Sequence, residues 1–256
     1  MQLSKRLLAV ADMVTEGNRL ADVGTDHGYV PIYLVKRGRI PWAIAMDVNK
    51  GPLARAEKNI AIHAAGQYIE TRLSDGVQEL HPKEVDSIII AGMGGSLVIK
   101  ILTEGEAVCR SADEMILQPQ SDIAKVRYYL NEHGYQIIRE DMILEDGKFY
   151  PMMKVSGMDE QEILKKKYET AENGPEILKG SRKTLTEDEE LYNRYGRYLL
   201  ENQNPVLWHF LKKEAAVIKE IHANICSMDS TEAVTRRKEI EQEMQYIHAA
   251  QKYYEV

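Results

Sequence analysis

LADVGTDHGY, residues 20–29, is the stretch of sequence that decides the fold class. Its first four residues are typical of the end of a buried strand, and an apolar helical pattern starts near Tyr29. Gly24 and Gly28 lie in the turn between them, where glycine allows positive φ and close approach of the backbone to a ligand. A strand, a glycine turn and a helix in this order predict an α/β fold with a ligand-binding loop.

Acidic residues distinguish this loop from dinucleotide-binding loops. It reads Asp-x-Gly-x-Asp-x-Gly, with carboxylates at Asp22 and Asp26 and no third glycine where a pyrophosphate would lie. Carboxylates repel phosphate and attract cations. They favour a ligand with an amino group, a sulfonium and a ribose, which together indicate S-adenosylmethionine.

Two more carboxylates follow later strand-like runs. Asp47 ends the run AIAMD, where a carboxylate can accept both hydroxyl groups of a ribose. Asp75 follows a third run and can accept a hydrogen bond from an adenine amino group, although Ser-Asp-Gly is also an ordinary turn. We therefore predict a cofactor site that contains Asp22, Gly24, Gly28, Asp47, Val48, Asp75, Gly76 and Gly92.

Strand-like and helix-like runs alternate from Asn18 to about Val155, as in a doubly wound parallel sheet. Glu145-Asp146-Gly147-Lys148 predicts a hairpin between the last two strands. A hairpin at this place indicates the Rossmann-like, seven-stranded sheet of class I methyltransferases, whose last strand is antiparallel. The strands are expected at residues 19–23, 42–47, 69–74, 87–91, 114–118, 135–141 and 149–155.

The strand pattern stops after Val155. A charged connector containing Lys165–Lys167 follows, and Asn204 with Pro205 then starts a helix. Asp229 and Glu232 are spaced as a capping box for a second helix. Apolar residues near a seven-residue repeat predict that the two helices form an antiparallel coiled coil. The expected domains are residues 1–157, which bind the cofactor, and residues 158–256, which are helical.

Composition limits the class of protein further. A net charge of −7 argues against non-specific coating of nucleic acid, although local basic patches remain. No apolar run reaches the ~20 residues needed to cross a bilayer, so no membrane partner is expected. Cys109 and Cys226 are isolated, which favours reduced thiols in the cytoplasm. No His/Cys cluster with metal-ligand spacing occurs, so no metal is expected.

The candidate catalytic residues lie in two loops near the expected methyl group: Asp26, His27, Tyr29, Gly92 and Met93. Asp26 could bind the cofactor amine or the amine of a target base. His27 could contact the base or collect a proton, or be an ordinary loop histidine, and Tyr29 could stack on the base or pack its helix. The glycine-rich loop at residues 91–95, which contains Gly92 and Met93, could instead bind phosphate. A phosphate-binding P-loop would continue with Lys-Ser or Lys-Thr, and neither pair follows this loop. The amides of Gln118 and Gln120 could read a base edge.

Several motifs narrow the superfamily to one family. DVGTDHGY, AMDVNKGPLARAEKNI, SDGV, IIAGMGG, LQPQSD and the helical region after YGRYLLENQNP resemble the bacterial tRNA (adenine-N1)-methyltransferases that modify nucleotide 22. The resemblance covers nearly the whole chain. It implies S-adenosylmethionine as cofactor, tRNA as partner, and a C-terminal coiled coil that helps to hold tRNA.

Methylation of adenine N1 needs little acid–base chemistry, because N1 has a free lone pair. Catalysis by positioning and electrostatics is then expected, without a nucleophile–histidine pair. We also expect a monomer. Two alternatives remain: a methyltransferase for a small molecule or another RNA position, and a non-catalytic protein that binds the cofactor.

Overall fold

The computed structural model describes residues 1–159, 186–226 and 231–255. The chain divides into two compact units, Met1–Arg182 and Lys183–Val256. The predicted boundary after Gly157 stays a prediction, and the basic connector at Lys165–Lys167 lies outside the described residues. None of the helices within these ranges is both long and apolar enough to cross a bilayer.

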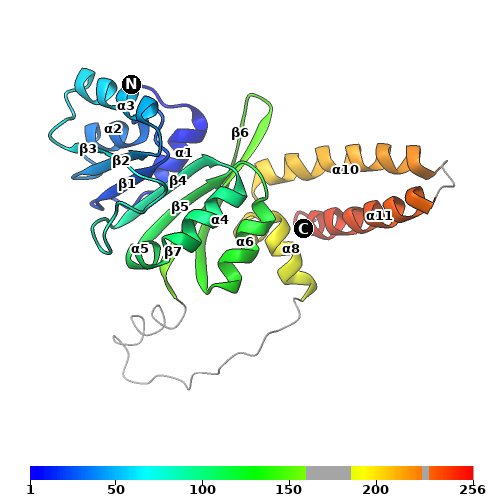
Figure 1. The fold of residues 1–256 in the computed structure, drawn as a ribbon. Helices are drawn as coiled ribbons and strands as arrows, with labels where there is room; N and C mark the ends of the chain where they lie inside the picture. The colour runs from blue at the N-terminus through cyan, green and yellow to red at the C-terminus, as the bar shows by residue number, and fades with distance from the viewer. Residues whose placement is uncertain (160–185, 227–230, 256) are drawn as a thin grey trace. The chain divides into compact units, whose positions relative to one another are not determined.

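The amino-terminal unit contains a seven-stranded sheet in the order β3-β2-β1-β4-β5-β7-β6 (Figure 1). Strands β1 to β5 pair in parallel, and β7 is antiparallel to both β5 and β6. The predicted seven strands and the antiparallel last strand are confirmed. The strands are β1 (Leu20–Val23), β2 (Ala43–Asp47), β3 (Ile69–Leu73), β4 (Ser87–Met93), β5 (Glu114–Pro119), β6 (Tyr135–Glu145) and β7 (Lys148–Asp159).

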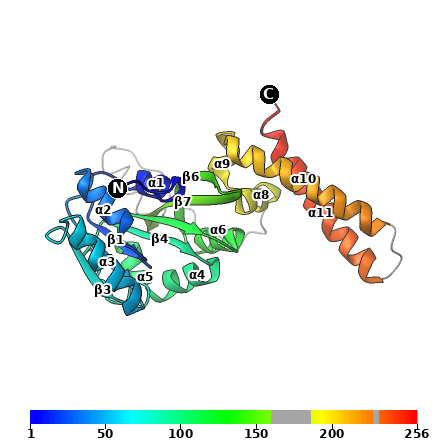
Figure 2. The same cartoon turned by 90° about the horizontal axis from the view of Figure 1, so that it is seen from above.

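Helices cover both faces of this sheet, and the central strands are therefore buried on both sides. Side chains alternate along each strand, so Leu20 and Ile89 pack with α1, α2 and α3, whereas Val23 and Ile88 pack with α4, α5 and α6. In Figure 1, α1, α2 and α3 lie on one side of the strands and α4, α5 and α6 on the other, and Figure 2 shows the same elements from above. The helices are α1 (Lys5–Met13), α2 (Tyr29–Lys36), α3 (Lys50–Ile62), α4 (Gly95–Glu104), α5 (Glu106–Ser111) and α6 (Ile123–Glu132).

The β6–β7 hairpin has the turn that its sequence predicts. Asp146 and Gly147 have φ values of 49° and 74°, and a two-residue turn of this kind needs positive φ at both positions. The hairpin also contacts α1, because the Glu145 carboxylate accepts hydrogen bonds from the backbone N–H groups of Lys5 (2.6 Å) and Arg6 (3.4 Å). These bonds satisfy backbone donors that the first turn of a helix leaves open.

Strand β4 is longer than the sequence predicts, and the start of α3 is held by a backbone turn. Strand β4 continues past Ala91 to Met93, because a register shift at Gly92, with φ of 83°, lets Met93 pair with Pro119. Asn49 occupies the N-cap position of α3, but its side chain makes no capping bond. Its backbone N–H instead donates to Asp47 Oδ1 at 2.7 Å, as in an Asx turn.

The carboxyl-terminal unit is helical, with α8 (Glu187–Tyr195), α9 (Arg197–Glu201), α10 (Pro205–Cys226) and α11 (Thr231–Lys252). Asn204 caps α10 as predicted: its side-chain oxygen accepts from the backbone N–H groups of Val206 (2.9 Å) and Leu207 (3.1 Å). Helices α10 and α11 bury apolar residues such as Leu211 and Ile240. Coiled-coil packing stays a prediction, and the capping box at Asp229 and Glu232 lies outside the described side chains.

Candidate active site

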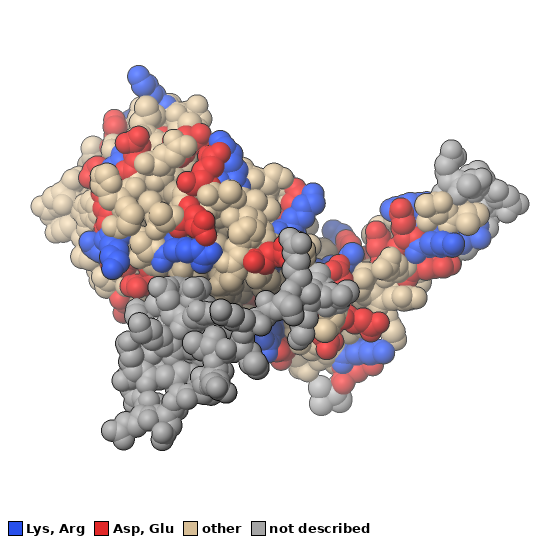
Figure 3. All heavy atoms as spheres, turned by 60° about the horizontal axis from the view of Figure 1, so that its bottom comes forward, with Lys and Arg blue, Asp and Glu red and all other residues tan. Residues whose placement is uncertain are grey.

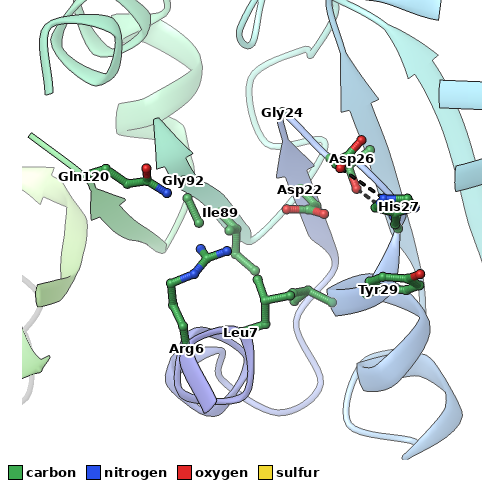
Figure 4. A pocket seen from close by; sticks show the side chains of 14 residues that line it. Arg6, Leu7, Asp22, Gly24, Asp26, His27, Tyr29, Ile89, Gly92 and Gln120 are labelled. Atoms are coloured by element: carbon green, nitrogen blue, oxygen red, sulfur yellow. Dashed lines mark hydrogen bonds and ion pairs between the residues drawn. The ribbon is translucent and has the colours of Figure 1, made fainter. Parts of the chain in front are cut away.

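A cavity of about 390 Å³ opens at the carboxyl ends of β1 and β4 (Figure 4). The chain leaves β1 toward β2 on one side and returns through β4 on the other, so these strands form the switch point of the sheet. Ligands of open α/β sheets bind at this place. Residues from α1, β1, the loop to α2, and β4 line the cavity.

The loop after β1 is held tightly against β2. The backbone N–H groups of Gly24 and Thr25 both donate to the Met46 carbonyl oxygen at 2.8 Å. Gly24 has φ of 77°, and a Cβ there would collide with the Met93 side chain. Gly28 has φ of 68°, and its N–H donates to Thr25 Oγ1 at 3.2 Å. The glycines therefore permit a turn that other residues would strain.

Asp22 is a buried carboxylate in the wall of this cavity, with 8% of its surface exposed. Burial raises the pKa of Asp22 to about 6. A hydrogen bond with Thr25 acts in the opposite direction, and the charge of Asp47 raises the pKa further. A buried carboxylate with this pKa favours a cationic ligand, because the cation would compensate its lost hydration.

Asp26, His27 and Tyr29 lie together along one side of the cavity (Figure 4). His27 Nε2 is 3.1 Å from Asp26 Oδ2, and the His27 and Tyr29 rings stack at 4.9 Å between centroids with planes 9° apart. Arg55 of α3 also binds Asp26, with its Nε donating to Oδ1 at 3.1 Å. Arg55 was missed by the sequence prediction because only the tertiary fold brings α3 to this loop.

Asp47 and Asp75 lie at the ends of β2 and β3 but outside the cavity lining, as do Val48, Gly76 and Met93. Asp47 ends β2, and its carbonyl oxygen accepts from the Ser74 N–H at 2.9 Å. Asp75 is half exposed and pairs with Lys100 Nζ at 3.3 Å. Val48 is exposed over 57% of its surface. Four of these residues therefore lie at the ends of β2 and β3, and the Met93 side chain lies beneath the loop after β1.

Gly92 lines the cavity together with Gln120 and Arg6. The sequence predicted that Gln120 could read a base edge, and it gave no role to Arg6. A Cβ at Gly92 would lie 3.7 Å from Gln120 Nε2 and 3.8 Å from Arg6 Nη1. Gln120 lines the cavity, whereas Gln118 is fully buried and accepts a hydrogen bond from Arg6 Nη1 at 2.8 Å. No sequence signal distinguishes Arg6, since a basic residue on an amphipathic helix usually lies on a solvated face.

Metal-ligating side chains do not gather in groups of three or more anywhere in the described part of the chain.

Residues 3–153 match a family model for a methyltransferase domain. The tRNA (adenine(22)-N(1))-methyltransferase of Bacillus subtilis (strain 168) is 35% identical over 159 residues, which cover 62% of this chain and 67% of the relative. This chain belongs to the tRNA (adenine(22)-N(1))-methyltransferase family. The resemblance that the sequence motifs indicated is thus confirmed.

Solved structures of the family share the whole fold. A Streptococcus pneumoniae protein, provisionally described as a tRNA (m1A22) methyltransferase and solved with S-adenosyl-L-methionine, is 32% identical with a TM-score of 0.77. The match covers 97% of this chain and 99% of that one. The B. subtilis m1A22 tRNA methyltransferase TrmK is 26% identical with a TM-score of 0.78, over 97% of this chain and 98% of that one.

Proposed function

We propose that this chain transfers the methyl group of S-adenosylmethionine to N1 of the adenine at position 22 of tRNA. The observation that carries the proposal is the buried Asp22 carboxylate beside open glycine backbone, in a cavity at the sheet's switch point. Membership of the tRNA (adenine(22)-N(1))-methyltransferase family supports this reaction over methylation of a small molecule.

Several residues would hold the cofactor. Asp22 would bind the methionine amino group, Asp47 the ribose hydroxyls, and Asp75 the adenine amino group. The exposed Val48 side chain would cover the adenine ring, and glycine backbone would line the path between these groups: Gly24, Gly28, Gly76 and Gly92. When bound, S-adenosylmethionine supplies an electrophilic methyl group on its sulfonium.

The loop residues would position the target base. N1 lies on the Watson–Crick edge of adenine, so the base has to leave its stack to be reached. The parallel His27 and Tyr29 rings offer a flat surface for such a base. Asp26 could accept a hydrogen bond from its exocyclic amine, and Gly92 with Met93 would leave room beside the transferred methyl group.

The two parts of the chain would divide the work. Residues 1–157 would bind the cofactor, and the helical residues 158–256, as a coiled coil, would hold tRNA. Basic and acidic side chains are intermingled on the face of the helices seen in Figure 3, so tRNA contacts would be local. We further propose a cytoplasmic monomer that needs no metal, since adenine N1 requires no activation before attack.

Methylation of defined tRNA tests the proposal. The purified protein is incubated with methyl-labelled S-adenosylmethionine and an unmodified tRNA transcript, and the nucleosides are analysed by mass spectrometry. We expect 1-methyladenosine, and none in a transcript with guanine at position 22. Transfer only to a metabolite extract would support a small-molecule enzyme. Cofactor binding without transfer to any acceptor would indicate a non-catalytic protein.

A further inference from the structure

The cofactor groups assigned above leave one without a partner: the carboxylate of its methionine part. We propose that Arg6 of α1 binds this carboxylate, and that Glu145 of the β6–β7 hairpin positions Arg6 to do so. The inference rests on the proposed function and adds an anion-binding residue to the same site.

Arg6 projects from α1 into the cavity, as Figure 4 shows. Its Nη1 lies 3.8 Å from the place where a Cβ on Gly92 would be, so the guanidinium borders the glycine backbone near the end of β4. Asp22 lies across the cavity from it (Figure 4). A cation and a carboxylate thus face one cavity of about 390 Å³ from two walls.

This charge arrangement fits an amino acid zwitterion. The ammonium and carboxylate of a methionine end are separated by a single carbon atom, so their partners need opposite charges that face the same cavity. Arginine binds carboxylates in a planar, two-bond geometry. A phosphate fits less well, because Asp22 and Asp26 line the same cavity and would repel its larger negative charge.

The guanidinium is held in place before any ligand binds. Nη1 donates to Gln118 Oε1 at 2.8 Å, and Gln118 is itself fully buried and donates from Nε2 to the Pro119 carbonyl oxygen at 3.2 Å. The Tyr150 ring lies under the guanidinium, 5.6 Å from its carbon to the ring centroid. An arginine has five N–H donors, so the bond to Gln118 leaves donors for a carboxylate.

Glu145 fixes the backbone that carries Arg6. Its carboxylate accepts from the N–H groups of Lys5 and Arg6, and Tyr150 belongs to the same β6–β7 hairpin. The hairpin therefore holds both ends of Arg6, its backbone and its guanidinium. Glu145 is a positioning residue, since it acts on the ligand only through Arg6.

Pairing each variant with a shortened ligand tests Arg6. Calorimetry on the full-length protein compares S-adenosylmethionine with decarboxylated S-adenosylmethionine, which keeps the amino group and lacks only the carboxylate. We expect the wild type to bind S-adenosylmethionine roughly 10- to 100-fold more tightly than the shortened ligand. Arg6→Gln should remove this preference and leave the affinity for the shortened ligand unchanged. Lys5→Gln, which removes the neighbouring exposed charge, should keep the preference.

A double-variant cycle tests Glu145. Glu145→Ala should weaken binding of S-adenosylmethionine several-fold without affecting the shortened ligand, and Glu145→Gln, which keeps one acceptor oxygen, should restore part of the loss. In the Arg6→Gln background, Glu145→Ala should cause no further loss. A loss of equal size in that background, or for both ligands, would mean that Glu145 only stabilises the fold.

Other outcomes would overturn the assignment of Arg6. One is a wild type that does not discriminate between the ligands, a comparison that requires no variant to fold. Another is an Arg6→Gln protein whose only defect is a raised KM for tRNA, which would assign the guanidinium to a nucleic-acid phosphate. A wild type that binds neither ligand would instead refute the proposed function from which this inference starts.

Discussion

At Asp22, burial makes the charged carboxylate costly to the folded protein. Its pKa is about 6 in the fold against an ordinary value of 3.8, so the native state binds a proton more tightly than the unfolded chain. The free energy of unfolding therefore falls as the pH rises between these two values and stays lower above them. A site that holds a cation here weakens its own fold at neutral pH.

Replacing Asp22 with asparagine should consequently stabilise the protein while damaging cofactor binding. We expect Asp22→Asn to raise the free energy of unfolding at pH 7.5 by on the order of 1–3 kcal/mol, measured by urea denaturation. The difference should shrink as the pH is lowered and disappear near pH 3, below the ordinary value of 3.8, where Asp22 is mostly protonated in both states. A variant less stable than the wild type at pH 7.5 would show that the charge of Asp22 is compensated within the fold.

The same titration should appear in cofactor binding. Below a pH of about 6 the Asp22 carboxyl becomes protonated and loses its attraction for an amino group. Affinity for S-adenosylmethionine should therefore fall as the pH is lowered from 8 to 5, by up to about tenfold per pH unit below the pKa. Calorimetry across this range checks the prediction, with Asp22→Asn as a control whose weak binding should not change with pH.

Asp47 has a structural contact as well as its predicted role in ribose binding. We expect Asp47→Ala to weaken cofactor binding by roughly 1.5–3 kcal/mol, the size of hydrogen bonds to a charged acceptor. Because Asp47 Oδ1 also accepts the Asn49 N–H, the alanine variant would loosen the start of α3. Asp47→Asn keeps an oxygen for this bond and should lose nearly as much affinity if both hydroxyls donate. Unchanged affinity in the alanine variant would refute the assignment.

Among the elements, the loop between β1 and α2 should act more on turnover than on cofactor binding. Asp26→Ala and His27→Ala should lower kcat at saturating S-adenosylmethionine by about 10- to 100-fold through misplacement of the base. Arg55→Ala is the matched control, because it removes the other side chain that binds Asp26. Equal losses of cofactor affinity and kcat in the Asp26 and His27 variants would assign both residues to the cofactor.

The elements also show how far the sequence determines the site. Runs of apolar residues and glycine turns are local signals, so the strand ends that carry Asp22 and Asp47 were predicted from them. Arg6, Arg55 and Glu145 carry no such signal, because contacts between distant segments bring them to the site. The continuation of β4 through Gly92 was missed for the same reason: it depends on pairing with β5.

At the scale of the whole molecule, a net charge of −7 has to be reconciled with a polyanionic substrate. The sequence indicates Arg236, Arg237 and Lys238 of α11 as one basic cluster, and the structure separates their roles. Arg237 is half-buried and donates from Nη2 to the Ile225 carbonyl oxygen at 3.4 Å, so it contributes to packing between α10 and α11. Arg236 and Lys238 are exposed, although Arg236 pairs with Glu239 at 2.8 Å.

Charge reversal should therefore be confined to the two exposed residues. We expect the double variant Arg236→Glu, Lys238→Glu to weaken tRNA binding and to leave cofactor affinity unchanged. The slope of log affinity against log salt concentration should flatten by the amount that corresponds to the loss of up to about two phosphate contacts. The matched control reverses Lys36 and Lys83, which are exposed and precede β2 and β4, at the edge of the sheet opposite the cavity. If tRNA affinity and its salt slope are the same in both double variants, the cluster is an ordinary solvated helix face. The RNA would then have to contact the amino-terminal unit or the basic connector at residues 165–183, since a net-acidic protein can bind a polyanion only through local positive surface.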